Sequence, residues 1–253
     1  MIINTTRPVI LSFTTIPERI QKSTAIVKDI LTNIDGFEYL IVNIPKIYKT
    51  FSWNLSDKDL EELKNIRDRR LIINRTDDYG PLTKLLGTLQ RFPIKDAILI
   101  IFDDNFYHHE AFKIIAEKQD ENTNKSFTYY KYKYNNEPLL GSAAKRCIDV
   151  AQGVDMISFW LSNLQHFRDY YNQIKHNKYC FYVDDLVISN YLKEQNIPIE
   201  QLQRKWKWAW KQDDSAPTGR VFELFKIKGI YSRDNSMRMC YNELNKGVDC
   251  SIL

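Results

Sequence analysis

Short apolar segments alternate with longer amphipathic segments through the first part of this chain, and this alternation restricts the possible folds more than any other feature. The apolar segments are short and rich in isoleucine, leucine and valine, which is typical of buried strands. They are residues 8–13, 39–44, 71–74 and 97–102. Strands that alternate with helices predict an open parallel sheet with right-handed crossovers. We therefore expect an α/β fold with a mostly parallel sheet flanked by helices.

Capping patterns mark the starts of the connecting helices. Thr15 followed by Pro17 has the form of an N-cap and a first helical turn. Ser56-Asp57-Lys58-Asp59 resembles a capping box. The helices are expected at residues 17–34, 56–67 and 82–92.

The second half of the chain is less regular. It predicts an edge strand at 126–133, a helix at 161–174, and a strand at 179–183 that leads into a helix at 185–194. No internal repeat or clear linker divides the sequence. We therefore expect a single domain over 1–253, made of two halves, 1–107 and 108–253.

Composition and charge are those of an ordinary globular protein. The 253 residues are 43% hydrophobic and carry a formal net charge of +4, which suits an anionic small ligand but is too small to indicate nucleic acid. Neither a leader pattern nor an apolar run long enough to span a membrane is visible. We expect a cytoplasmic protein. Its four cysteines show no metal-binding or disulfide spacing, so we expect free thiols.

Polar side chains follow three of the four expected strands. They are Thr14-Thr15, Asp77-Asp78-Tyr79-Gly80-Pro81 and Asp103-Asp104-Asn105. Open parallel sheets bind ligands at the carboxyl ends of their strands. These three segments are therefore expected to meet at one binding site.

The acidic segment after the fourth strand has the chemistry of a metal site. Carboxylates such as Asp103 and Asp104 bind Mn²⁺ or Mg²⁺ beside a diphosphate, and the amide oxygen of Asn105 can also bind a hard cation. A polar turn closed by an Asx motif is the alternative.

The segment from Asp78 to Lys84 joins a tight turn to a helix start. Backbone N–H groups and the ammonium of Lys84 suit a phosphate there, and Asp78 suits a base or ribose. An ordinary Gly-Pro turn followed by a solvated lysine is the alternative.

Four blocks together resemble a family. They are residues 12–19 (SFTTIPER), 75–85 (RTDDYGPLTKL), 101–105 (IFDDN) and 183–189 (VDDLVIS). In order and spacing these blocks look like GT-A glycosyltransferases, a Rossmann-like group that includes enzymes of large DNA viruses of algae and amoebae. The resemblance implies a nucleotide-diphosphate-sugar donor, first of all a UDP-sugar, Mn²⁺ or Mg²⁺, and a glycan or glycoprotein acceptor. If the protein is viral, the resemblance also allows a location in the host cytoplasm or in the virion.

The resemblance also implies roles for individual residues. Residues 1–107 would bind the nucleotide and 108–253 would supply the acceptor side. Asp103 and Asn105 would hold the metal, and Gly153 and Asp104 would lie near the donor sugar. The nucleotide-binding set would be Thr14, Thr15, Arg19, Asp78, Tyr79, Lys84, Asp103 and Asp104.

Asn105 departs from the family pattern, which ends this cluster with a third aspartate. The amide removes one negative charge and so weakens a metal site. A catalytically weak or inactive protein that binds glycans or acts as a scaffold therefore remains an alternative. A nucleotidyltransferase is another, although residues 14–19 lack the glycine-rich loop typical of that class.

Asp184 and Asp185 open the helix at 185–194, and either carboxylate there suits the general base that deprotonates an acceptor hydroxyl. Asp185 is our first choice. Two helix caps are the alternative. A carboxylate base without a separate nucleophile favours inversion at the anomeric carbon.

Trp206-Lys207-Trp208-Ala209-Trp210 alternates indoles with other residues. As a strand it would present three rings on one face. These rings would form either an acceptor platform or part of the core. Tyr129–Tyr134 mixes rings with cations as nucleic-acid surfaces do, but an aromatic edge strand explains it equally well. His108-His109 lacks any zinc-ligand spacing.

Overall fold

A mixed sheet forms the centre of the molecule in the computed structural model, which describes residues 1–92, 96–136, 146–211 and 232–245. Within these residues the sheet has seven strands in the order β3-β2-β1-β4-β8-β5-β9. The strands are β1 (Val9–Thr14), β2 (Tyr39–Pro45), β3 (Leu71–Thr76), β4 (Ile98–Ile101), β5 (Ser126–Thr128), β8 (Ile157–Trp160) and β9 (Ile199–Gln201).

The first four strands pair in parallel, as their alternation with helices predicted. Strand β8 then runs antiparallel to both β4 and β5, and β9 runs parallel to β5. One sheet therefore takes strands from both halves of the sequence. The expected α/β fold with a mostly parallel sheet is confirmed.

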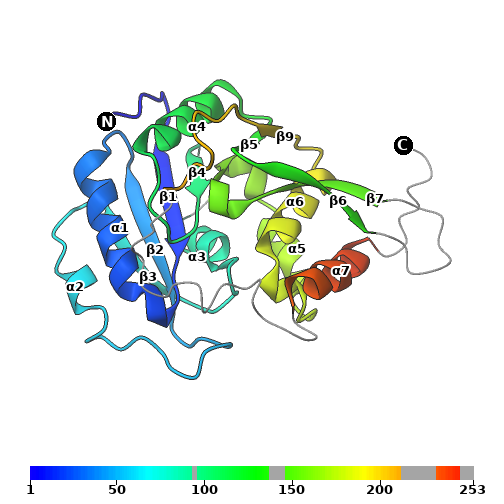
Figure 1. Cartoon of the computed structure of the whole chain (residues 1–253), viewed down its shortest axis with the longest axis horizontal. Helices are drawn as coiled ribbons and strands as arrows, with labels where there is room; N and C mark the ends of the chain where they lie inside the picture. Colours follow the sequence, from blue (N-terminus) through cyan, green and yellow to red (C-terminus); the bar gives the residue numbers. More distant parts are fainter. Residues whose placement is uncertain (93–95, 137–145, 212–231, 246–253) are drawn as a thin grey trace.

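Helices cover both faces of the sheet (Figure 1). They are α1 (Ile20–Asn33), α2 (Glu61–Lys64), α3 (Thr83–Arg91), α4 (His109–Glu121), α5 (Phe167–Ile174), α6 (Asp184–Glu194) and α7 (Arg233–Leu244). Single-turn 3₁₀ helices are η1 (Pro17–Arg19), η2 (Gly153–Asp155), η3 (Leu161–Leu164) and η4 (Cys180–Tyr182).

Alternation along the strands assigns side chains to two separate cores. In β1, Val9 and Leu11 pack with α1, α2 and α4, whereas Ile10 packs with α3, α5, α6 and α7. All four residues of β4 are fully buried, as the apolar run at 97–102 predicted. Among the described helices, none combines the length and hydropathy needed to cross a bilayer.

A hairpin of β6 (Lys131–Asn136) and β7 (Arg146–Ala151) lies beside the main sheet. The amide of Ala151 donates to the hydroxyl of Ser189 in α6 at 3.0 Å. The rings of Tyr134 and Tyr241 lie 5.4 Å apart and join the hairpin to α7. The expected edge strand at 126–133 is therefore two strands, β5 and β6, in different sheets.

The expected strand at 179–183 is wrong, and the tryptophan-rich segment does not form the strand that was considered for it. Residues 180–182 form the 3₁₀ helix η4, and residues 205–209 form bends that end in an isolated bridge between Trp210 and Tyr107. Both segments are rich in aromatic residues, which favour strands locally, but here they pack in connections between elements.

Two helix starts also differ from expectation. Thr15 is not an N-cap, because Ile16 precedes η1 and no side chain caps it. The capping-box residues do bond reciprocally: the amide of Ser56 donates to Asp59 at 2.8 Å, and the amide of Asp59 donates to Ser56 at 3.3 Å. The helix itself spans only Glu61–Lys64.

A disulfide joins Cys180 of η4 to Cys240 of α7, which corrects the expectation of free thiols for these two residues. The remaining cysteines, Cys147 and Cys250, are not among the side chains that the structure describes. The crosslink closes a sequence separation of 60 residues. It therefore attaches α7 to the segment that precedes Asp184.

Replacing both cysteines, as Cys180→Ser/Cys240→Ser, is expected to lower the free energy of unfolding by about 2–4 kcal/mol, because the crosslink restricts the unfolded chain. Urea unfolding of the wild type and the double variant measures this. Peptide mapping without reductant should find the Cys180–Cys240 pair. Equal stability of the two proteins would contradict the prediction.

Candidate functional site

A buried lysine is the centre of a polar cluster at the carboxyl edge of the parallel strands. Lys84 lies in the first turn of α3 and is 1% exposed. Its Nζ donates to Oδ1 of Asp103, which follows β4, at 2.6 Å. The same nitrogen lies 2.7 Å from Oδ2 of Asp184 in α6, an ion pair without the angular geometry of a hydrogen bond. The alternative of a solvated lysine is therefore wrong.

The charge of Lys84 depends on the carboxylates around it. Burial, the largest effect, would lower the pKa of Lys84, but Asp103, Asp184 and Asp185 together outweigh it and the pKa is raised. The lysine is therefore charged over the whole physiological range. It is the counter-ion of an acidic cluster drawn from both halves of the chain.

Gly153 of η2 closes this cluster from the side of the β7–β8 connection. Its amide donates to Oδ1 of Asp185 at 2.8 Å. A Cβ at this position would lie 2.8 Å from Nζ of Lys84 and 3.2 Å from Oδ1 of Asp185. Only glycine lets the backbone approach both groups so closely. Met156, which ends this turn, has a φ of 63°, a strained conformation for a non-glycine residue.

The two aspartates at the start of α6 are not side-chain caps. Val183 is the N-cap residue, and no side chain bonds there. Asp184 is buried against Lys84, whereas Asp185 is partly exposed. The alternative that both aspartates cap the helix is therefore wrong.

Asp104 is held by residues at the start of the chain. Arg19 donates to its Oδ1 at 2.7 Å, and Thr15 donates to its Oδ2 at 2.9 Å. Burial raises the pKa of Asp104, while Arg19 and Thr15 act in the opposite direction. Thr15 thus binds a carboxylate rather than capping a helix.

The neighbouring polar residues already have protein partners. Asn105 accepts from Nζ of Lys22 at 3.0 Å, and Thr14 donates to the carbonyl of Asn43 at 2.8 Å. The structure therefore brings Asp103, Asp104 and Asn105 to the sheet edge but directs each to a different partner.

Asp78 and Tyr79 lie in the turn before α3. Asp78 accepts from the amides of Lys49 at 2.6 Å and Gly80 at 2.8 Å. Gly80 has a φ of 62°, and a Cβ there would lie 2.4 Å from the carbonyl oxygen of Phe181. The Tyr79 ring meets the Tyr171 ring of α5 edge to face at 5.6 Å. This turn therefore contacts the second half of the chain, as Lys84 does.

A buried network, missed at the sequence level, fixes α3 on the sheet. Ser12 donates to the carbonyl of Lys84 at 2.6 Å, and Asn43 donates to Ser12 at 2.9 Å. Asn74 donates to Asn43 at 2.8 Å and to the carbonyl of Gly87 at 2.9 Å. Polar residues within apolar strands are the signal that points to such a network.

Tyr107 and Asp155 were also missed. The hydroxyl of Tyr107 accepts from the amide of Asp103 at 3.1 Å and donates to the carbonyl of Val154 at 2.9 Å. Asp155 is fully buried and accepts from the amide of Ala209 at 2.9 Å. These residues join the acidic segment, η2 and the tryptophan-rich segment, which are far apart in the sequence.

Oxygen donors for a divalent cation are present, although no group of three or more His, Cys, Asp or Glu side chains in the described residues is arranged to hold one. The side chain of Asp103 is 38% exposed, and its Oδ2 forms no hydrogen bond or ion pair with the residues that the structure describes. Mg²⁺ is commonly held by one or two carboxylates together with substrate phosphates. Asp103 fits that role, whereas the oxygen of Asn105 is already bonded to Lys22.

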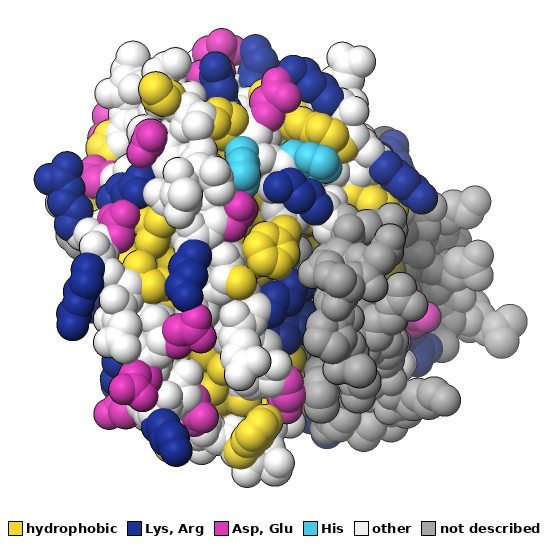
Figure 2. Space-filling view, turned by 60° about the vertical axis from the view of Figure 1, so that its left-hand side comes forward, with side chains coloured by type: hydrophobic (Ala, Val, Ile, Leu, Met, Phe, Trp, Pro, Cys, Tyr) yellow, Lys and Arg dark blue, Asp and Glu magenta, His cyan; other side chains and the backbone are white. Residues whose placement is uncertain are grey.

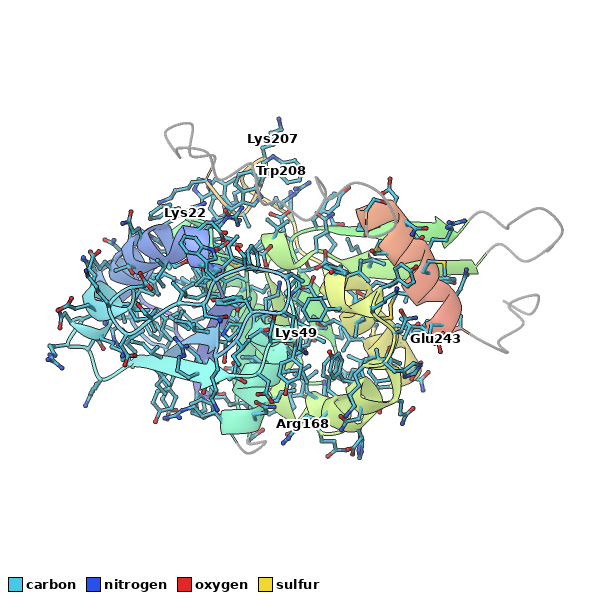
Figure 3. All side chains as sticks on the ribbon, turned by 90° about the horizontal axis from the view of Figure 1, so that it is seen from below. Lys22, Lys49, Arg168, Lys207, Trp208 and Glu243 are labelled. Atoms are coloured by element: carbon cyan, nitrogen blue, oxygen red, sulfur yellow. A yellow bond between two sulfur atoms is a disulfide. The ribbon has the colours of Figure 1, made fainter. Side chains whose placement is uncertain are left out.

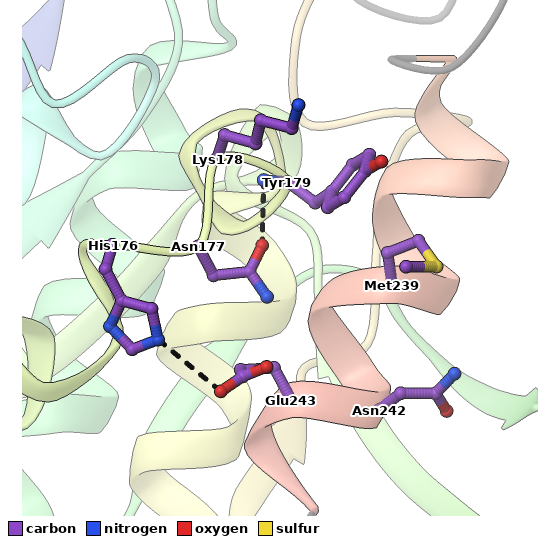
Figure 4. Close-up of a pocket in the computed structure, with 7 residues that line it drawn as sticks. All are labelled: His176, Asn177, Lys178, Tyr179, Met239, Asn242 and Glu243. Carbon is purple, nitrogen blue, oxygen red and sulfur yellow. Dashed lines mark hydrogen bonds and ion pairs between the residues drawn. The ribbon is translucent and has the colours of Figure 1, made fainter.

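A separate hollow of about 460 Å³ lies between the α5–η4 loop and α7 (Figure 4). His176 of the loop lies 3.5 Å from Glu243 of α7 across it. None of its lining residues belongs to the polar cluster around Lys84.

Comparisons with known proteins add no identification. No protein-family model matches this chain, and no curated protein is significantly similar to it in sequence. We therefore argue its function from the geometry of the site.

Lys84→Met is expected to destabilise the protein by about 3–5 kcal/mol at pH 7.5, because it leaves the buried carboxylate of Asp184 and the partly exposed carboxylate of Asp103 without their counter-ion. In the wild type the raised pKa of Lys84 means that its contribution is complete below pH 10.5 and is lost only as pH rises through the higher folded value.

Urea unfolding at pH 7.5 measures the difference. Lys113→Met is the matched control, because Lys113 lies on the surface of α4. A loss for Lys84→Met no larger than that for Lys113→Met would contradict the electrostatic explanation.

Proposed function

We propose that this chain is a GT-A type glycosyltransferase that moves a sugar from a nucleotide-diphosphate-sugar, first of all a UDP-sugar, to a glycan acceptor with inversion. The observation that carries the proposal is the convergence on Lys84. Asp103 after β4, Asp184 and Asp185 in α6, and Gly153 in η2 surround one ammonium at the carboxyl edge of a parallel sheet. Such an edge is where nucleotides bind in open α/β sheets.

Asp185 is the proposed general base. It is partly exposed, whereas Asp184 is buried against Lys84. The amide of Gly153 orients the carboxylate of Asp185 through one oxygen. In the reaction, the acceptor hydroxyl oxygen forms a bond to the anomeric carbon, and its proton passes to Asp185. The bond from that carbon to the phosphate oxygen breaks, and the nucleoside diphosphate leaves.

The cationic groups at the edge suit the leaving diphosphate. Lys84 and Arg19 are each paired with an aspartate in the described structure, so a divalent cation beside them would supply the further positive charge that a diphosphate needs. The N-termini of α3 and α6 also face this edge and favour negative charge.

A divalent cation is part of the proposal, with Asp103 as its protein ligand. Mn²⁺ or Mg²⁺ bound there would offset the negative charge that develops on the departing diphosphate. Asp104 acts differently, because Arg19 and Thr15 occupy both of its oxygens. Its proposed part is to fix the loop that carries Asp103.

One observation favours a second candidate, a non-catalytic glycan-binding protein of the same fold. The side chain of Asn105, where the resembling family has a third aspartate, bonds to Lys22. Turnover of the donor separates the two candidates, because a glycan-binding protein releases no nucleoside diphosphate.

A UDP-sugar is expected to bind at least about tenfold more tightly with Mn²⁺ than without it, because the cation reduces repulsion between the diphosphate and Asp103. Titration calorimetry over a panel of UDP-sugars, with and without Mn²⁺, measures this. Asp103→Asn should remove the metal dependence, and Asp96→Asn, an exposed aspartate before β4, is the control. Affinity that is independent of Mn²⁺ would exclude the metal site.

Asp185→Asn is expected to lower UDP release by at least about a hundredfold, since a general base contributes that much or more. Donor affinity should stay the same and the melting temperature should change little, because the amide oxygen still accepts from Gly153 and Asp185 acts on Lys84 less than Asp103 and Asp184 do. Asp184→Asn should instead lower the melting temperature, because it weakens the pairing of Lys84. UDP release by Asp185→Asn at the wild-type rate would place the base elsewhere.

A further inference from the structure

An aromatic and basic surface lies next to the polar cluster, and the proposed transfer step does not use it. We call it the platform. It consists of Tyr130, Arg204, Trp206, Lys207, Trp208, Trp210 and Lys211.

The rings of the platform are held in pairs. Trp206 stacks on His108 with centroids 4.6 Å apart and an interplanar angle of 5°. Trp208 stacks on Trp210 at 6.2 Å, and Tyr130 meets Trp208 at 6.1 Å with an angle of 70°. The three indoles therefore do not share the single strand face that alternation predicted.

Arg204 fixes one side of this arrangement. Its guanidinium carbon lies 5.3 Å from the ring centroid of Tyr130 and 5.3 Å from that of Trp208. It also donates to the carbonyl of Lys207 at 2.8 Å. The rings are thus oriented before any ligand arrives, which reduces the entropy lost on binding.

Backbone contacts join the platform to the acidic segment. The amide of His108 donates to Ala209 at 3.0 Å, and the amide of Lys211 donates to Phe106 at 2.7 Å. Trp210 forms a bridge with Tyr107, whose hydroxyl accepts from the amide of Asp103. A ligand on the platform would therefore lie beside the proposed site of transfer.

The three indoles are partly exposed, and the lysines between and after them are exposed. Lys205 pairs with Glu110, but Lys207 and Lys211 have no acidic partner among the residues that the structure describes. Figure 3 shows the side chain of Lys207 extending outward beside Trp208. On the face drawn in Figure 2, histidine side chains lie beside basic and hydrophobic ones.

We infer that the platform binds the acceptor, and that this acceptor is an acidic saccharide whose carboxylate, sulfate or phosphate group meets Lys207 and Lys211. The inference rests on the proposed function and adds the chemical class of the acceptor. The apolar faces of sugar rings stack on indoles, and two ammonium groups without an acidic partner among the described residues select a negative charge.

The ring arrangement favours a saccharide over single-stranded nucleic acid. Nucleic-acid surfaces offer a row of separate rings along a strongly positive groove. Here Trp206 is stacked on His108, and Trp208 on Trp210, so the rings lie in two pairs rather than in a row. The net charge of +4 is also low for nucleic-acid binding.

Titration calorimetry of the full chain at low salt, without a nucleotide sugar, tests the inference. The probes are tetragalacturonic acid and its methyl ester, which has the same sugar rings without the charges. The acid is expected to bind at least about tenfold more tightly than the ester. Trp208→Ala should weaken binding of the acid by at least about tenfold, and Lys207→Gln/Lys211→Gln should remove the preference for the acid.

Trp53→Ala and Lys58→Gln are matched controls, because both residues are exposed and lie outside the platform. Absence of binding to the acid would overturn the inference, as would equal binding of acid and ester. If a short oligothymidylate binds more tightly than the acid, and Trp208→Ala removes this binding, the surface would be assigned to nucleic acid instead.

The UDP-release assay on the same preparation separates the two proposals. Preference for the acid without any donor turnover would reject the glycosyltransferase and its acceptor together, and leave a glycan-binding protein. Donor turnover without saccharide binding would reject the platform alone.

Discussion

The ion pairing of one buried lysine links the fold of this protein to its candidate site. An ammonium as buried as that of Lys84 is stable only when negative charge surrounds it closely. Asp103 supplies that charge from the first half of the chain, and Asp184 supplies it from the second. The same contacts that join the two halves therefore also arrange the carboxylates at the sheet edge, so stability and chemistry depend on one set of atoms.

Much of the first half was predictable, because its strands are short apolar runs whose order fixes a parallel sheet. The meeting of Thr15, Asp78 and Asp103 at one edge followed from that topology alone. The pairing within the edge did not follow. Thr15 has the residue type of a helix cap, yet its hydroxyl bonds to Asp104, a partner distant in the sequence. Local sequence patterns indicate secondary-structure propensity, whereas the hydrogen-bond partner of a side chain depends on tertiary packing.

The second half was harder to predict, because its aromatic segments have strand propensity without the regular alternation that defines a strand. Residues 179–183 were predicted to form a strand, but they contain a 3₁₀ turn that a disulfide joins to α7. The aspartates after it were predicted to open a helix, and both lie in the first turn of α6. Which of them is buried was not predictable, because it depends on Lys84 and Gly153, neither of which is near in sequence.

The antiparallel pairing of β8 with β4 has a consequence for how this chain can be made. Every residue of β4 is fully buried, and β8, which covers one of its edges, is synthesised more than fifty residues later. A nascent chain that ends before β8 exposes an apolar strand with unpaired backbone groups, which is a template for aggregation. The first half of the chain, residues 1–107, is therefore a poor fragment to express alone, and during synthesis it needs β8 or a chaperone to cover this edge.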